Sequence, residues 1–205
     1  MIYNKSDISL LIFITIIIIV FIFYKKRKES YQNTKRISIN KTFVINMKKD
    51  TKRLNYIKGE CTKVGIIFEI FEGIDGTKLN INQLKKNNLI KLHKYSFFNH
   101  NKQGRNSLNG SIGCALTHQS IWKHIAKSKK QNTLILEDDV IITPNFWNKF
   151  NIYSKHIPNN WDIIFLGGVR IFGKKISKNI IKATSTAYNV MNNCGLYAYI
   201  LNKNS

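Results

Sequence analysis

The stretch TLILEDDV, residues 133–140, decides the fold that we expect for this chain. Its first four residues form a continuous, mostly apolar run, which is typical of a strand buried on both faces of a parallel sheet. Three acidic residues follow at once: Glu137, Asp138 and Asp139. Open α/β sheets bind their ligands at the carboxyl ends of such strands. The stretch therefore predicts a central buried strand with its acids at the ligand-binding edge.

Comparable segments flank this strand on both sides. Further strands are predicted over residues 42–46, 66–71, 161–166 and 195–201. Helices are predicted from Asp50 or Thr51 to Gly65, over residues 111–127, and from Pro144 to about residue 155. Residues 77–109 are rich in Asn and Lys and are expected to form a long loop with a helical turn or two. Strands that alternate with helices predict an α/β fold with a doubly wound, mostly parallel sheet.

The three adjacent carboxylates have two interpretations. Ionised carboxylates in a row repel one another, so a cation between them would stabilise them. Mn²⁺ or Mg²⁺ prefers oxygen ligands and can bridge to substrate phosphates. In the alternative interpretation, the acids belong to a solvated loop or cap a helix. The metal-site interpretation is favoured because acidic residues are scarce in this chain: these three are among only eleven.

Three other residues could bind a ligand. Arg53 and Lys49 follow the first predicted strand at its carboxyl end, where a cation can meet a phosphate. In a Lys-rich chain they could equally be ordinary surface cations. His118 lies on the apolar stripe of the predicted helix over residues 111–127, between Cys114 and Ile121. A histidine at such a position is either a core residue or a binding residue.

The N-terminal segment is strongly apolar. Ile8–Tyr24 contains no charged residue, and a helix of that length spans roughly 25 Å, just enough for a hydrocarbon core. A cleaved signal peptide is the alternative, but the run ends in KKRK (25–28) and not in small residues. We therefore expect a flank and transmembrane anchor over residues 1–24, a basic juxtamembrane linker over 25–41 and a folded domain over 42–205. The segment predicts a single-pass membrane protein, and the positive-inside rule places its domain in the cytoplasm. The alternative is a domain in the lumen.

The composition argues against a nucleic-acid binder in spite of the charge. Lys and Arg number 33 against 11 Asp and Glu, a formal net charge of +22, which would attract phosphates. Only five of these cations are arginines, however, and no aromatic RNA-binding motif is present. The three cysteines are too few and too widely spaced for a disulfide framework or a four-cysteine zinc site. We expect them to be buried as small hydrophobic residues.

Six ordered segments together resemble glycosyltransferase family 25, the family of lipooligosaccharide-biosynthesis proteins and procollagen galactosyltransferases. In chain order they are FVIN (43–46) with Arg53, FEGIDG (71–76), GCALTH (113–118) with IW (121–122), LEDDV (136–140), WDIIFLG (161–167) and GLYAYI (195–200). The chain departs from the family at Ser111, where members usually have Glu. Members also usually continue beyond the last of these segments, so we expect the domain to be incomplete, or truncated, at its C-terminal end.

The resemblance implies a GT-A-like nucleotide-sugar fold. It also implies transfer of a hexose, galactose or glucose, from a UDP-sugar to a hydroxyl group of a glycan, a lipooligosaccharide or a protein, with inversion and metal assistance. By position in the motifs, Glu137 and Asp139 would hold Mn²⁺ or Mg²⁺. The residues that would lie at the donor are Arg53, Asp75, His118 and Asp138.

An inverting transfer needs a base that takes the proton from the acceptor hydroxyl. Asp162 is the one acid after Asp139, so it is the candidate, with a structural role at the start of a strand as the alternative. This shortage of acids leaves a second function open. The chain could be a non-catalytic, membrane-tethered interaction protein that keeps the domain but not the reaction.

Overall fold

The computed structural model describes residues 15–23, 25, 37–90, 104–128, 132–168, 171–184 and 195–202. The described part of the domain is built around one five-stranded sheet, in the order β2-β1-β3-β7-β4. The strands are β1 (Lys41–Asn46), β2 (Glu69–Glu72), β3 (Thr133–Glu137), β4 (Ile163–Phe165) and β7 (Ala198–Leu201).

Four of the five strands of this sheet run in the same direction. β1 is parallel to both β2 and β3. β7 is antiparallel to β3 and to β4, so β4 points the same way as β3 although the two are not neighbours. The carboxyl ends of β1, β2 and β3 therefore meet at one edge of the sheet, as the sequence predicted for the acidic run.

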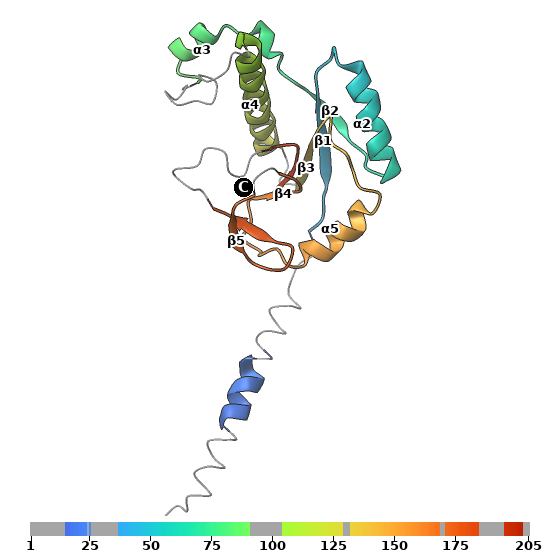
Figure 1. Cartoon of the computed structure of the whole chain (residues 1–205), viewed down its shortest axis with the longest axis vertical. Helices are drawn as coiled ribbons and strands as arrows, with labels where there is room; N and C mark the ends of the chain where they lie inside the picture. The colour runs from blue at the N-terminus through green and yellow to red at the C-terminus, as the bar shows by residue number, and fades with distance from the viewer. Residues whose placement is uncertain are drawn as a thin grey trace, which may run out of the picture.

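Helices cover both faces of the sheet (Figure 1). The helices α2 (Thr51–Lys63) and α5 (Phe146–Ser154) pack on one face, and α4 (Gly104–Lys127) packs on the other. Side chains alternate along each strand, so Leu134 and Leu136 face α2 and α5, whereas Ile135 faces α4. This arrangement buries β3 on both faces, which explains its uninterrupted apolar run.

Several elements differ from the prediction in extent. Helix α4 begins at Gly104, seven residues before the predicted start, and a short helix α3 (Ile81–Lys86) lies within the predicted loop. The structure adds a two-stranded hairpin of β5 (Gly173–Lys175) and β6 (Ile181–Ala183). A 3-10 turn, η1 (Gly76–Lys78), follows β2 and lies against α4.

The predicted membrane anchor requires a correction. Residues 15–23 are helical, but in the part of the chain that the structure describes no helix is both long enough and apolar enough to span a bilayer. The prediction of a single-pass membrane protein anchored through Ile8–Tyr24 is therefore wrong, and the transmembrane part of the predicted fold class is wrong with it. The cytoplasmic localisation that was inferred from this anchor is withdrawn. The first part of the predicted span, residues 8–14, and most of the predicted linker, residues 26–36, lie outside the described residues.

Candidate functional site

Polar side chains meet where β1 and β3 end. The two strands are in register with Ile45 opposite Glu137, so Asn46 lies beside the beginning of the acidic run. After Glu137 the backbone leaves the sheet in a turn over residues 138–139. This turn presents the next two acids at the edge where open α/β sheets bind ligands.

Asp138 is the most enclosed of the three acids. Its side chain is buried beside α2, and both of its oxygens have protein partners. The Asn46 side-chain amide donates to Oδ2 over 2.7 Å, and the Arg53 guanidinium donates to Oδ1 over 3.2 Å. Asp138 thus fixes the position of Arg53 relative to the two strand ends.

Arg53 links α2 to the acidic run. Its Nη1 also lies 3.5 Å from Oδ2 of Asp139, whose side chain is 50% exposed. Partial desolvation opposes the charge of Arg53, but the carboxylates of Asp138 and Asp139 outweigh it and raise the pKa of the guanidinium. The accessible edge therefore carries a permanent cation next to an exposed carboxylate.

Glu137 points to the other face of the sheet, toward α4. Its Oε1 lies 3.2 Å from Nε2 of His118, and Nδ1 of the same imidazole lies 2.8 Å from the hydroxyl of Tyr199. The indole of Trp122 donates to that hydroxyl over 2.8 Å. A carboxylate only accepts, so Nε2–H of His118 donates to Glu137. His118 is only 1% exposed, so in this structure it holds Glu137 and is not accessible to a donor substrate.

Cys114 lies one helical turn before His118 on α4. Its Sγ lies 3.7 Å from Oε1 of Glu137. Although the residue is exposed, desolvation of its thiol and the charges of Glu137 and Asp139 raise the pKa of Cys114 to about 11. The ligand atoms of Cys114, His118 and Glu137 all lie within 4.8 Å of one another. Among the described residues, this is the one group of three side chains that could hold a metal ion.

Asp75 lies on the turn after β2 and pairs with Lys49. Lys49 Nζ is 2.8 Å from Oδ2, and the hydroxyl and backbone N–H of Thr77 donate to Oδ1 over 2.7 and 3.1 Å. The hydrogen bond from Lys49 and those from Thr77 hold the pKa of Asp75 well below its usual range. Asp75 is therefore an ionised carboxylate whose contacts are with Lys49 and Thr77 and not with Arg53.

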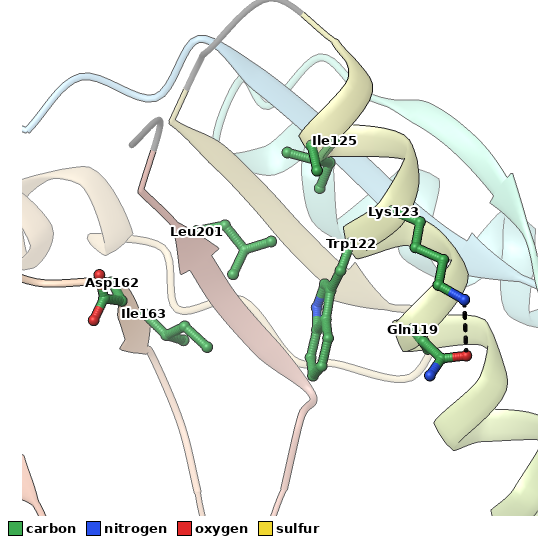
Figure 2. Close-up of a pocket in the computed structure, with 8 residues that line it drawn as sticks. Gln119, Trp122, Lys123, Ile125, Asp162, Ile163 and Leu201 are labelled. Atoms are coloured by element: carbon green, nitrogen blue, oxygen red, sulfur yellow. Dashed lines mark hydrogen bonds between the residues drawn. The ribbon is translucent and has the colours of Figure 1, made fainter. Parts of the chain in front are cut away.

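The structure does not bring Asp162 to the acidic run. Asp162 comes just before β4, and Ile163 is level with Thr133, the first residue of β3, across Leu201 of the intervening strand. Glu137 is the last residue of β3, and Asp138 and Asp139 follow it. At about 3.3 Å per residue, this places the two edges roughly 15 Å apart. Asp162 instead borders a groove of about 410 Å³ whose other walls include Trp122, Ile163 and Leu201. Figure 2 shows the Asp162 carboxylate at the margin of this groove, away from α4.

The sequence profile of glycosyltransferase family 25 (LPS biosynthesis protein) matches residues 39–204, which is most of the chain. The chain belongs to glycosyltransferase family 25. The match includes every candidate site residue described above, from Asn46 to Tyr199.

Three individual proteins are similar to parts of the chain. The procollagen lysyl hydroxylase and glycosyltransferase of Acanthamoeba polyphaga mimivirus is 32% identical over 140 residues, 62% of this chain and 15% of the relative. Human procollagen galactosyltransferase 2 is 29% identical over 148 residues, 71% of this chain and 23% of the relative. The glycosyltransferase 25 family member of Drosophila melanogaster is 29% identical over 150 residues, 72% of this chain and 24% of the relative. The matched part of the chain spans less than a quarter of the length of these relatives.

Four residues of the site were not predicted as site residues from the sequence: Asn46, Cys114, Trp122 and Tyr199. Cys114 is spaced to share one helix face with His118, but the same spacing fits a core stripe, so it did not single out Cys114. Asn46 is the last residue of a predicted strand, and this position indicated that it lies at the carboxyl edge of the sheet. The contact between Tyr199 and His118 joins two segments 81 residues apart, and no local pattern indicates it.

Proposed function

We propose that this family 25 domain transfers a hexose, galactose or glucose, from a UDP-sugar to a hydroxyl group of a glycan, a lipooligosaccharide or a protein, with inversion. The observation that carries the proposal is the pairing of Arg53 with Asp138 and Asp139 at the carboxyl edge of the central strand. This edge offers a fixed cation for a diphosphate next to carboxylates for a metal ion. The name of the human relative, procollagen galactosyltransferase 2, supports a galactosyl donor and a protein acceptor.

Arg53 and the Lys49–Asp75 pair would bind the donor. Arg53 is half exposed and is oriented by Asp138, so its outer N–H groups can bind phosphate oxygens without losing the inner salt bridge. Asp75 stays ionised and can accept hydrogen bonds from ribose or sugar hydroxyls. Asp138 would act indirectly, because both of its oxygens are engaged by Asn46 and Arg53.

Glu137 and Asp139 would hold a hard divalent ion, Mn²⁺ or Mg²⁺, at this edge. Asp139 is half exposed and its contact with Arg53 is long, so its oxygens are available as ligands. Glu137 is 21% exposed and is held in place by His118. When bound, such an ion neutralises the charge that develops on the leaving diphosphate. The protein would contribute the orientation of Glu137 through His118 and a second positive charge through Arg53.

The proposal assigns the acceptor base to no residue. Asp162 was the sequence candidate, but its place at the opposite edge of the sheet keeps it from a hydroxyl that attacks a sugar held near Asp139. The Asp162→Asn variant therefore serves as a control in the experiment below.

The test is a donor-hydrolysis and thermal-shift screen of the full chain with UDP-galactose, UDP-glucose and other UDP-sugars, with and without Mn²⁺. At a donor concentration of 100 times the Kd, binding stabilises the fold by about 2.7 kcal/mol, which is a measurable rise in Tm. We expect the shift and the hydrolysis to be lost in Asp139→Ala and retained in Asp162→Asn. Binding without hydrolysis would favour a non-catalytic relative. The absence of both with every UDP-sugar would refute the proposal.

A further inference from the structure

We infer that Cys114, His118 and Glu137 form a binding site for a thiophilic divalent cation, Zn²⁺. Two elements supply the ligands: α4 contributes the thiol and the imidazole one turn apart, and the end of β3 contributes the carboxylate. This inference goes beyond the proposed function, which requires only an ion with oxygen ligands. A thiolate and an imidazole select Zn²⁺ over Mg²⁺ or Mn²⁺.

The distances between the ligand atoms fit a tetrahedral ion. With Zn–N and Zn–O bonds of about 2.0–2.1 Å and a Zn–S bond of about 2.3 Å, tetrahedral angles separate ligand atoms by about 3.3–3.6 Å. In the structure, Nε2 of His118 lies 3.2 Å from Oε1 of Glu137, and Sγ of Cys114 lies 3.7 Å from the same oxygen. Two of the three separations are thus near those that the ion requires, and small side-chain rotations can bring the third into range.

The surroundings of His118 match those of a metal-bound imidazole. Metal-ligating histidines nearly always have their second ring nitrogen hydrogen-bonded, which fixes the ring. Here Nδ1 of His118 lies 2.8 Å from the hydroxyl of Tyr199, and Trp122 in turn donates to that hydroxyl. With the ion on Nε2, the ring proton moves to Nδ1 and is donated to the oxygen of Tyr199, which can accept this bond together with the one from Trp122.

The other two ligands leave an open side. Cys114 is exposed and Glu137 is partly exposed, so a fourth position faces solvent, as in zinc sites with three protein ligands. On binding, the thiol of Cys114 loses its proton to the buffer as the Zn–S bond forms, and His118 binds the ion as a neutral imidazole. One thiolate and one carboxylate then balance the charge of the ion.

Glu137 is shared with the acidic run, but the two sites have separate markers. Cys114 belongs only to the Zn²⁺ site, and Asp139 belongs only to the proposed Mn²⁺ site. Substitution of one or the other therefore tests each proposal without deciding the other.

The experiment is a titration of the metal-free, reduced full chain with Co²⁺, followed by displacement with Zn²⁺. We expect one equivalent to produce the near-ultraviolet charge-transfer band of a cobalt–thiolate bond and the visible bands of tetrahedral Co²⁺. Zn²⁺ should remove both. The Cys114→Ser variant should lose the charge-transfer band, and Tyr199→Phe should weaken the affinity by about 10- to 100-fold, as expected when the hydrogen-bond partner of a ligand is removed.

Two controls locate the signal. Cys61→Ala removes a thiol on the opposite face of the sheet and should keep the band, and Asp139→Asn should keep it as well. A measurement on the wild-type chain avoids any folding defect: Zn²⁺ should slow the alkylation of Cys114, followed by mass spectrometry, at least tenfold. No charge-transfer band in the wild type, a full band in Cys114→Ser, or unchanged alkylation would each overturn the inference.

Discussion

The side-chain amide of Asn46 donates to Oδ2 of Asp138 over 2.7 Å, and this hydrogen bond joins the ends of two adjacent parallel strands. Both side chains are buried, and Asn46 also donates to the backbone oxygen of Asp50 at the start of α2. Arg53 occupies the other oxygen of Asp138. A single amide therefore sets the geometry of β1, β3 and the first turn of α2, the three elements that meet at the candidate donor site.

Asn46→Asp should destabilise the fold. The substitution replaces a donor with a second carboxylate facing Asp138 in a buried position, so one hydrogen bond is lost and two like charges are brought together. We expect a loss of about 1–3 kcal/mol in the free energy of unfolding, measured by urea denaturation. Asn55→Asp, an exposed position on α2, is the matched control and should change the stability by less than about 0.5 kcal/mol. Equal stability of Asn46→Asp and the wild type would show that the amide has no such role.

Arg53→Lys should affect donor binding more than folding. The lysine keeps the positive charge but loses the planar fork that can contact Asp138 and a phosphate at the same time. Because Arg53 is 54% exposed, its salt bridges contribute no more than about 1 kcal/mol to stability. We expect an affinity for UDP-sugars at least about tenfold lower by calorimetry, equivalent to about 1.4 kcal/mol, with a Tm close to that of the wild type. A variant that binds the donor normally would remove Arg53 from the site.

The sequence was sufficient to place the acidic edge. The run over residues 133–136 is apolar at every position but the first because β3 is buried by helices on both faces. This pattern can be recognised in the sequence without knowing which helices cover the strand. Gly65 likewise ends α2, with the positive φ of 67° expected at a helix end. Local chemistry determined these features, so local patterns predicted them.

The remaining features depend on tertiary contacts. Asp162 lies at the amino edge of the sheet because it precedes β4, which runs in the same direction as β3 on the far side of the antiparallel β7. A strand does not encode its direction in its own residues. The first turns of α4 were not predicted because they contain Gly104 and Gly110, which have low helix propensity. The hairpin of β5 and β6 is exposed at every position, so it lacks the alternation by which strands are recognised.

Asp75→Asn should reduce the loss of stability in acid. The pKa of Asp75 is lowered in the folded state, so its ionised form adds stability above the unfolded pKa of about 3.9, and this contribution disappears as the pH falls toward the folded value. We expect the wild type to lose more of its free energy of unfolding between about pH 5 and pH 3 than Asp75→Asn does. Thr77→Ala, which removes one donor to Asp75, should give an intermediate slope. Parallel stability curves for wild type and Asp75→Asn would contradict this prediction.

The contact between α4 and the turn that carries Asp75 depends on Gly113. A Cβ atom built at this position would lie 2.7 Å from the backbone oxygen of Ile74 and 2.8 Å from the backbone nitrogen of Gly76. Both neighbours are backbone atoms, so the helix and the turn would have to separate. Thr117, one turn further along α4, accepts a hydrogen bond from the backbone N–H of Ile74 over 2.8 Å and would lose it.

Gly113→Ala should therefore destabilise the fold, although alanine normally favours a helix. We expect a loss of about 1–3 kcal/mol from overpacking. Gly110→Ala is the matched control in the same helix, because a Cβ there would meet nothing within 4 Å. That variant should gain about 0.5–1 kcal/mol from helix propensity alone. Denaturant unfolding of the two variants measures the difference, and a stabilised Gly113→Ala would mean that α4 does not pack closely on the Asp75 turn.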